Sequence, residues 1–244
     1  MIKMNKKGSH VGVILSFVIF ITFIVFLYTV VRPIVTLGEN KQTTLEYIED
    51  KIMKNTSAEL TTVSIQIDNS KNPSGQSCIK LEDFFILSGA SFNIKVKNET
   101  NSLQEAYASP PHLMIVRKVG ANTFFKAYSS PEFEKIENKT ISPCFSMAYN
   151  TYYTFGSITT TKYVFEKEIY KLIEYYKTDY EKLKNELNIP PGNEFGFVFV
   201  QSNGTKIEVG NASKSVSVYA GEVPVQYVDD IANIHSGFIN VRVW

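Results

Sequence analysis

The longest mostly apolar segment of the chain is residues 11 to 31, which contains no Asp, Glu, Lys, Arg or His. At 1.5 Å per residue, a helix of this length covers about 30 Å, the hydrocarbon thickness of a bilayer. A buried core helix is a weak alternative, because a helix that is apolar on every face is rarely soluble. A cleaved secretory signal is a stronger alternative, although its apolar region usually spans only about 7 to 15 residues. We therefore predict a single-pass transmembrane helix, with the lipid bilayer as its partner.

The charges on either side of this segment predict its orientation. Lys3, Lys6 and Lys7 precede it, and Arg32 follows it closely. Because the more cationic flank stays in the cytoplasm, we expect residues 1–10 to form a cytoplasmic basic segment. The C-terminal domain is then extracellular and anchored at the cell membrane.

A second, more polar helix is expected after the apolar segment. Pro33 lacks an amide donor, so the first helix should bend or stop there. Leu45, Ile48 and Ile52 then recur at helical spacing. We predict a stalk helix within residues 32–58, which connects the membrane to the head.

From residue 59 onward, the pattern changes from a period near 3.6 to a period of two, which is typical of half-buried antiparallel strands. We therefore predict an α+β domain at 59–244, with turns at Asn203 and Gly204 and at Ser236 and Gly237 separating the last strands. A hairpin is expected from residues 113–119 and 123–128. The alternating apolar positions are Val63, Ile65, Ile67, Phe92, Ile94, Val96, Phe195, Phe197, Phe199, Ile239, Val241 and Val243.

One long amphipathic helix is expected at residues 163–188, ending before Pro190 and Pro191. Its apolar positions repeat every three or four residues, so it should cover one face of the sheet. It also separates an N-terminal from a C-terminal set of strands, which leaves open two subdomains that divide near residues 163–192. The apolar positions are Phe165, Ile169, Leu172, Tyr176, Tyr180, Leu183 and Leu187.

Two features after the apolar segment agree with an exported, glycosylated head. Five sequons occur there, and none has proline at its middle position. Cys78 and Cys144 are the only cysteines, and an oxidising compartment permits a disulfide bond between them, with two buried free thiols as the alternative. The expected glycosylation sites are Asn55, Asn98, Asn138, Asn203 and Asn211.

Composition excludes one class of partner, and the search for catalytic chemistry finds little. Net charge is +1, so nucleic acid is not an expected partner. The three histidines belong to no metal or nucleophile motif, and we expect no catalytic residue, metal or cofactor. Asp229, Asp230 and His235 form the nearest carboxylate and imidazole group, and Glu82 and Asp83 form a second acidic pair. Both groups are interpreted as solvated turns.

Lys6, Lys7, Gly8 and Ser9 directly precede the apolar segment. This arrangement resembles the class III signal of type IV pilin-like proteins, and the sequons and lysine-rich composition resemble archaeal pilin-like surface proteins. The resemblance implies cleavage by a prepilin peptidase between Gly8 and Ser9. It also implies a hydrophobic filament core that is interrupted by proline, followed by a polar helix and a strand-rich head.

The resemblance covers about the first 30 residues and departs from the family at Val13. Many bacterial pilins carry glutamate at this fifth position after the cut, and archaeal members often carry glutamine nearby. Charge pairing between neighbouring N-termini is therefore not expected here. Gly12 and Ser16 lie four residues apart on one helix face, a spacing of small residues that allows helices to approach closely.

Three functional hypotheses follow from the sequence. The first is a non-enzymatic, pilin-like structural subunit that assembles with itself or with other membrane proteins through residues 11–31. The second is a plain single-pass protein whose head binds a partner or a component of the cell envelope. The third is a membrane-tethered enzyme that uses dispersed carboxylates, which would require a concave cluster of acidic residues, with or without His235.

Overall fold

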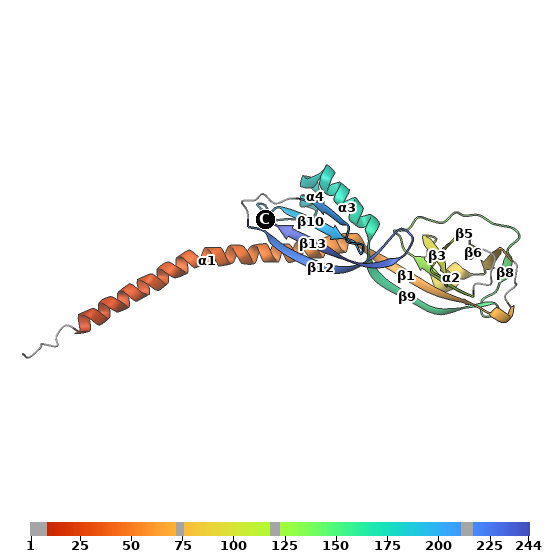
Figure 1. Ribbon diagram of the computed structural model, residues 1–244, viewed down its shortest axis with the longest axis horizontal. Coiled ribbons are helices and arrows are strands. Elements are labelled where there is room, and N and C mark those ends of the chain that lie inside the picture. Colours follow the sequence, from red (N-terminus) through yellow and green to blue (C-terminus); the bar gives the residue numbers. More distant parts are fainter. Residues whose placement is uncertain (1–8, 72–75, 118–122, 211–216) are drawn as a thin grey trace, which may run out of the picture.

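A computed structural model describes residues 9–71, 76–117, 123–210 and 217–244. Figure 1 shows a long helix, α1, that leaves one end of an elongated head. The helices are α1 (Ser9–Thr56), η1 (Asn69–Lys71), α2 (Phe84–Ser88), α3 (Glu166–Thr178) and α4 (Tyr180–Glu186). The strands are β1 (Ser57–Ile67), β2 (Cys78–Leu81), β3 (Ile94–Asn98), β4 (Leu103–Gln104), β5 (Ala106–Ser109), β6 (His112–Val116), β7 (Phe124–Ser129), β8 (Phe145–Met147), β9 (Tyr153–Phe165), β10 (Phe195–Val200), β11 (Lys206–Val209), β12 (Tyr219–Val228) and β13 (Ile234–Val243).

The two helices expected on either side of Pro33 form one helix. α1 is helical without interruption from Ser9 to Thr56, so the helix does not stop at Pro33, and of the predicted bend or stop only a bend is compatible with the structure. Proline removes one hydrogen-bond donor, but a long helix can continue past this loss when packing holds the turns that follow it. Here the later half is held by the head, because Leu45, Ile48 and Ile52 are buried in its core.

The head is an α+β structure built on one large sheet. Within the described residues, nine strands pair in the order β11-β10-β13-β12-β9-β1-β7-β3-β4, and four more form a second sheet in the order β5-β6-β2-β8. All pairs in the large sheet are antiparallel except β12 with β9, which meet only at Tyr227 with Val164 and at Val228 with Phe165. This short parallel contact joins the two halves of the sheet.

Two hydrophobic cores lie on this sheet and define two lobes of the head. We call them proximal and distal according to their distance from α1. The proximal lobe packs the end of α1, α3 and α4 on strands β10 to β13. The distal lobe packs the second sheet and α2 on β1, β3, β7 and β9. A smaller apolar cluster lies between them at the junction, where Leu60 and Phe165 meet Val228.

The helix expected at residues 163–188 is in fact a strand end and two helices. Residues 163–165 belong to β9, and Asp179 separates α3 from α4. The side chain of Asp179 accepts a hydrogen bond from the amide of Lys182 at 3.2 Å, which caps α4. The apolar face was predicted correctly, because Ile169, Leu172, Leu183 and Leu187 are all buried in the proximal core.

Two turn predictions are also wrong. The strands on either side of residues 118–122 do not form a hairpin, because β6 pairs with β2 and β5 whereas β7 pairs with β1 and β3. Ser236 and Gly237 lie inside β13, and the β12–β13 turn is closed earlier by a hydrogen bond from the Asp229 amide to the Asn233 carbonyl. Gly237 is required for close packing, since a Cβ there would lie 2.6 Å from the carbonyl oxygen of Val200.

We predict that Ile48→Ala loosens the head from α1. Ile48 is fully buried, and removing such a side chain costs about 2 to 5 kcal/mol. Urea unfolding of the full chain in detergent measures the change in the free energy of unfolding. Asp50→Ala is the matched control on the exposed face of the same helix and should change it by less than about 0.5 kcal/mol. Equal effects of the two variants would contradict the packing described here.

Candidate functional site

The apolar part of α1 is a long hydrophobic surface that is exposed in the structure. Gly12–Val30 is long and apolar enough to cross a membrane, and none of its side chains is buried in the head. Its large apolar side chains are 40% to 64% exposed. Contact of such a surface with water is unfavourable, so this segment could act as a membrane anchor or as a signal sequence.

The predicted residues of the N-terminal site are described only in part. Gly8 lies outside the described residues, and Ser9 is the first residue of α1. Gly12 lies on an open helix surface, because a Cβ added there would meet no atom within 4 Å. Ser16 lies one turn further along the same helix. A close approach of a second helix along this face is sterically possible.

The later part of α1 is fixed against the sheet by a close contact with β12. A Cβ at Gly221 would lie 1.9 Å from Oε1 of Glu49, the end of a flexible side chain, and 3.5 Å from Leu45, so both residues of α1 lie directly over this strand. Burial, with the negative charge of Glu46, raises the pKa of Glu49. The direction of the exposed half of α1 is therefore determined by the packing of its buried half.

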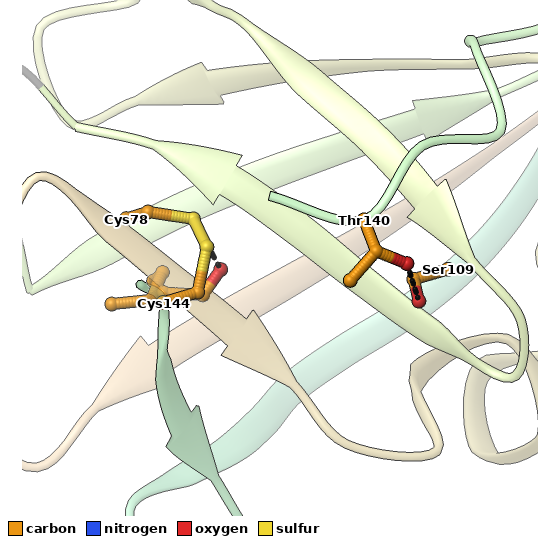
Figure 2. The surroundings of a disulfide bond; sticks show 5 residues. Cys78, Ser109, Thr140 and Cys144 are labelled. Atoms are coloured by element: carbon orange, nitrogen blue, oxygen red, sulfur yellow. Dashed lines mark hydrogen bonds between the residues drawn. A yellow bond between two sulfur atoms is a disulfide. The ribbon is translucent and has the colours of Figure 1, made fainter. Parts of the chain in front are cut away.

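The disulfide bond between Cys78 and Cys144 is present, as Figure 2 shows. It joins the first residue of β2 to the residue before β8, two strands that pair in parallel. The Cα atoms are 4.6 Å apart, and the two cysteines have a sequence separation of 66 positions. The bond therefore closes most of the distal lobe into one covalent loop.

Four of the five sequons fall within the described residues, and Asn211 lies outside them. Asn55, Asn138 and Asn203 are exposed, whereas Asn98 is half-buried at the end of β3. In the Asn138 sequon, the hydroxyl of Thr140 is 3.2 Å from that of Ser109, which holds the segment against β5 (Figure 2). Three asparagine side chains are thus accessible for glycosylation.

Asp229 and His235 do come together, at the junction between the lobes. His235 Nε2 is 3.1 Å from Asp229 Oδ2, and Asn233 donates to the same carboxylate from its amide nitrogen at 2.7 Å and from its side chain at 2.8 Å. Burial would raise the pKa of Asp229, but these hydrogen bonds and one from Ile231 outweigh it and lower that pKa. Asp229 is therefore an ionised turn cap and a poor proton acceptor.

Lys97, which no sequence pattern singled out, completes this junction. Its ammonium donates to the Asn233 side chain at 2.5 Å and lies over the Tyr128 ring. Burial lowers the pKa of Lys97, and the charge of Asp229 opposes that shift. The β12–β13 turn of the proximal lobe is thereby tied to β3 of the distal lobe.

A small cavity of about 190 Å³ adjoins this cluster. It gathers acidic side chains, as the enzyme hypothesis requires, but it is smaller than the roughly 300 Å³ at which ligand pockets begin. Its charged lining residues are Lys95, Glu132, Glu134, Lys167, Asp229 and Asp230.

Glu132 also pairs across the junction with Glu168 of α3. A hydrogen bond with Glu168, aided by burial, raises the pKa of Glu132. Burial alone would raise the pKa of Glu168, but hydrogen bonds from Glu132 and Lys171 lower it. The two carboxyl groups bond to each other, so this pair is a contact between the lobes.

The other candidate residues have structural partners. Nδ1 of His112 accepts a hydrogen bond from the Asp83 amide at 2.9 Å, and Glu82 accepts one from the hydroxyl of Ser146. The side chain of His10 lies outside the described residues. Among the residues that the structure describes, no group of three or more His, Cys, Asp or Glu side chains is placed to hold a metal ion.

Comparisons of the chain with protein-family models, with curated proteins and with solved structures found no match.

We predict that replacing Cys78 and Cys144 together by serine lowers the free energy of unfolding by about 4 kcal/mol, the value for closing a loop of this length. Hydrogen exchange should show the loss mainly in β2 and β8 of the distal lobe. Amides of β10 and β13 in the proximal lobe serve as the internal control. An equal loss of protection in both lobes would contradict the conclusion that the disulfide bond stabilises the distal lobe.

We also predict that Asp229→Asn reduces stability by about 1 to 3 kcal/mol near neutral pH, because charge-assisted hydrogen bonds are weakened. The folded pKa of Asp229 lies below its ordinary value of 3.8. Its contribution is therefore complete above that value and is lost as the pH falls through the folded pKa. Unfolding measured from about pH 7 to about pH 2 should show the two proteins converging in acid. A constant difference across this range would refute the ionised turn cap.

Proposed function

We propose that this chain is a membrane-anchored, surface-exposed structural subunit of the type IV pilin-like kind, without enzymatic activity. One observation carries the proposal: α1 is a single helix that is apolar and fully uncovered at one end and buried in the head at the other. The uncovered end requires lipid or neighbouring helices, and the buried end transmits their arrangement to the head.

The length of the uncovered segment suits both a lipid bilayer and a bundle of neighbouring helices. Its 19 residues extend about 28 Å as a helix, close to the thickness of a bilayer. Covering each large apolar side chain contributes about 1.5 to 3 kcal/mol, so transfer into lipid or into a helix bundle is strongly favoured. The small residues Gly12 and Ser16 support close helix packing in either place.

The continuity of α1 supports an assembly role over a simple tether. A flexible linker would let the head rotate freely about its anchor, whereas Leu45, Ile48 and Ile52 lock the helix into the proximal core. A regular array of α1 helices would therefore impose a regular array of heads. Exposed sequons and the Cys78–Cys144 bond support a head on the extracellular side.

Processing at the N-terminus separates this proposal from a plain single-pass anchor. We predict that the mature protein, isolated from its native membranes or cell surface, begins at Ser9. The N-terminal peptide identified by mass spectrometry measures this directly. Gly8→Leu should block the cleavage, because the glycine stands at the position that the signal requires.

Gly12→Leu is the matched control, since it adds the same side chain four residues further along and leaves the cleavage sequence intact. The mature form of this variant should begin at Ser9, like that of the parent protein. A parent protein that begins at Met1 or Ile2 would refute pilin-type processing and leave a single-pass protein whose head binds a partner.

A further inference from the structure

One cavity of the head lies where β1 ends and β9 begins, at the end of these two strands that is far from α1 in Figure 1. It encloses about 400 Å³, toward the lower end of the roughly 300 to 1,000 Å³ of small-molecule sites. No sequence pattern predicted it. Its lining residues are Gln66, Ile67, Asp68, Lys71, Thr123, Asn150, Thr151, Tyr152, Tyr153 and Thr154.

Main-chain hydrogen bonds connect the segments that line this cavity, which we call the tip cavity. The amide of Ile67 donates to the Thr123 carbonyl at 2.7 Å, and the amide of Asp68 donates to the Tyr152 carbonyl at 2.9 Å. The amide of Asn150 donates to the Tyr153 carbonyl at 2.8 Å. These bonds fix the backbone at residues 67–68, 123 and 150–153, so a ligand would not need to order that part of the lining.

The polar side chains of the cavity are largely uncommitted. Those of Gln66, Asn150 and Thr154 form no hydrogen bond with any other residue that the structure describes. Amide and hydroxyl groups both donate and accept hydrogen bonds. A ligand rich in hydroxyl groups has the same dual character and matches them.

The charged side chains of the cavity neutralise each other. Nζ of Lys71 is 3.4 Å from Asp68 Oδ2 and donates to the Thr151 carbonyl at 3.2 Å. Hydrogen bonds from the hydroxyl and amide of Ser70 lower the pKa of Asp68, so the carboxylate is ionised. One positive and one negative charge give no net preference for an anion or a cation.

An aromatic ring adds an apolar surface to this polar lining. Tyr152 is half-buried, and its ring meets that of Phe145 edge-on, with centroids 5.4 Å apart. This contact restricts the ring, which lowers the entropy lost when a ligand packs on it. The C–H face of a pyranose ring packs well against such a surface.

We propose that the tip cavity binds a neutral saccharide, a mono- or disaccharide unit of a larger glycan. The combination of free amide and hydroxyl groups, a compensated charge pair and a restrained tyrosine suits a sugar better than a phosphate, a metal ion or a lipid chain. The lining contains no histidine or cysteine, and its one carboxylate is engaged, so the site is suited to binding without hydrolysis.

The test uses the full chain, purified in lauryldimethylamine oxide, because a sugar-based detergent would compete for the site. Saturation-transfer difference NMR is recorded with glucose, galactose, mannose and N-acetylglucosamine, and with inorganic phosphate as the charged probe. We expect transfer to at least one sugar and no binding of phosphate. Titration then measures the dissociation constant.

Two variants place the sugar in the tip cavity. Thr154→Val removes one hydroxyl with little change in shape, and Asn150→Gly removes an amide while keeping the left-handed backbone found there, with φ of 60°. Each should raise the dissociation constant about tenfold, the effect of losing about 1.4 kcal/mol. Thr159→Val is the matched control on the same strand, exposed and outside the cavity, and should bind like the parent.

Three outcomes overturn the proposal: no transfer to any sugar, tighter binding of phosphate than of sugar, or unchanged sugar affinity in Thr154→Val. Because Thr154 is exposed, this variant keeps the test valid even if Asn150→Gly fails to fold. The readout does not depend on where the N-terminus begins. A negative result would therefore leave the pilin-like assembly intact, and a parent protein that begins at Met1 would leave the sugar site intact.

Discussion

The incompatibility between water and the first half of α1 is the constraint on which the rest of the structure depends. Nineteen consecutive residues lie uncovered on all sides, and the same helix continues without a break into the proximal core. Whatever environment covers the first half therefore determines where the head is and how it is oriented. The burial of Leu45, Ile48 and Ile52 joins the later half of α1 to the proximal core.

The two lobes depend on different interactions, and the junction combines them. The proximal lobe is held by apolar packing on α1, and the distal lobe gains a covalent closure from Cys78 and Cys144. Between them, the shared sheet has only a two-residue parallel contact from β12 to β9. Lys97, Asp229 and Asn233 supply polar contacts where the sheet is narrowest. The relative orientation of the lobes thus rests on these partly buried hydrogen bonds together with the apolar cluster of Leu60, Phe165 and Val228.

Local sequence patterns correctly predicted the structural features that depend on interactions between residues close in the sequence. The apolar segment, the disulfide bond and the alternating positions of β1 and β13 were all recognisable in the sequence, since burial in these two strands alternates with a period of two, whereas β10 is buried on both faces. Partners of distant strands were not, because β6 and β7 belong to different sheets although they neighbour each other in sequence. Gly237 looked like a turn residue but serves close packing. The tip cavity assembles residues 66–71 with residues 150–154, a proximity that only the fold creates.

The order of the lobes along the chain has a consequence for biogenesis. The distal lobe comes from the continuous stretch of residues 57–165, whereas the proximal lobe requires α1 together with strands up to β13. Because chains emerge from the ribosome N-terminus first, the distal lobe can fold before the strands of the proximal lobe have been synthesised. The proximal lobe closes onto its helix only after the final strand arrives. Until then, Leu45, Ile48 and Ile52 of α1 have no strands to pack against, so this apolar face stays exposed after the distal lobe has folded.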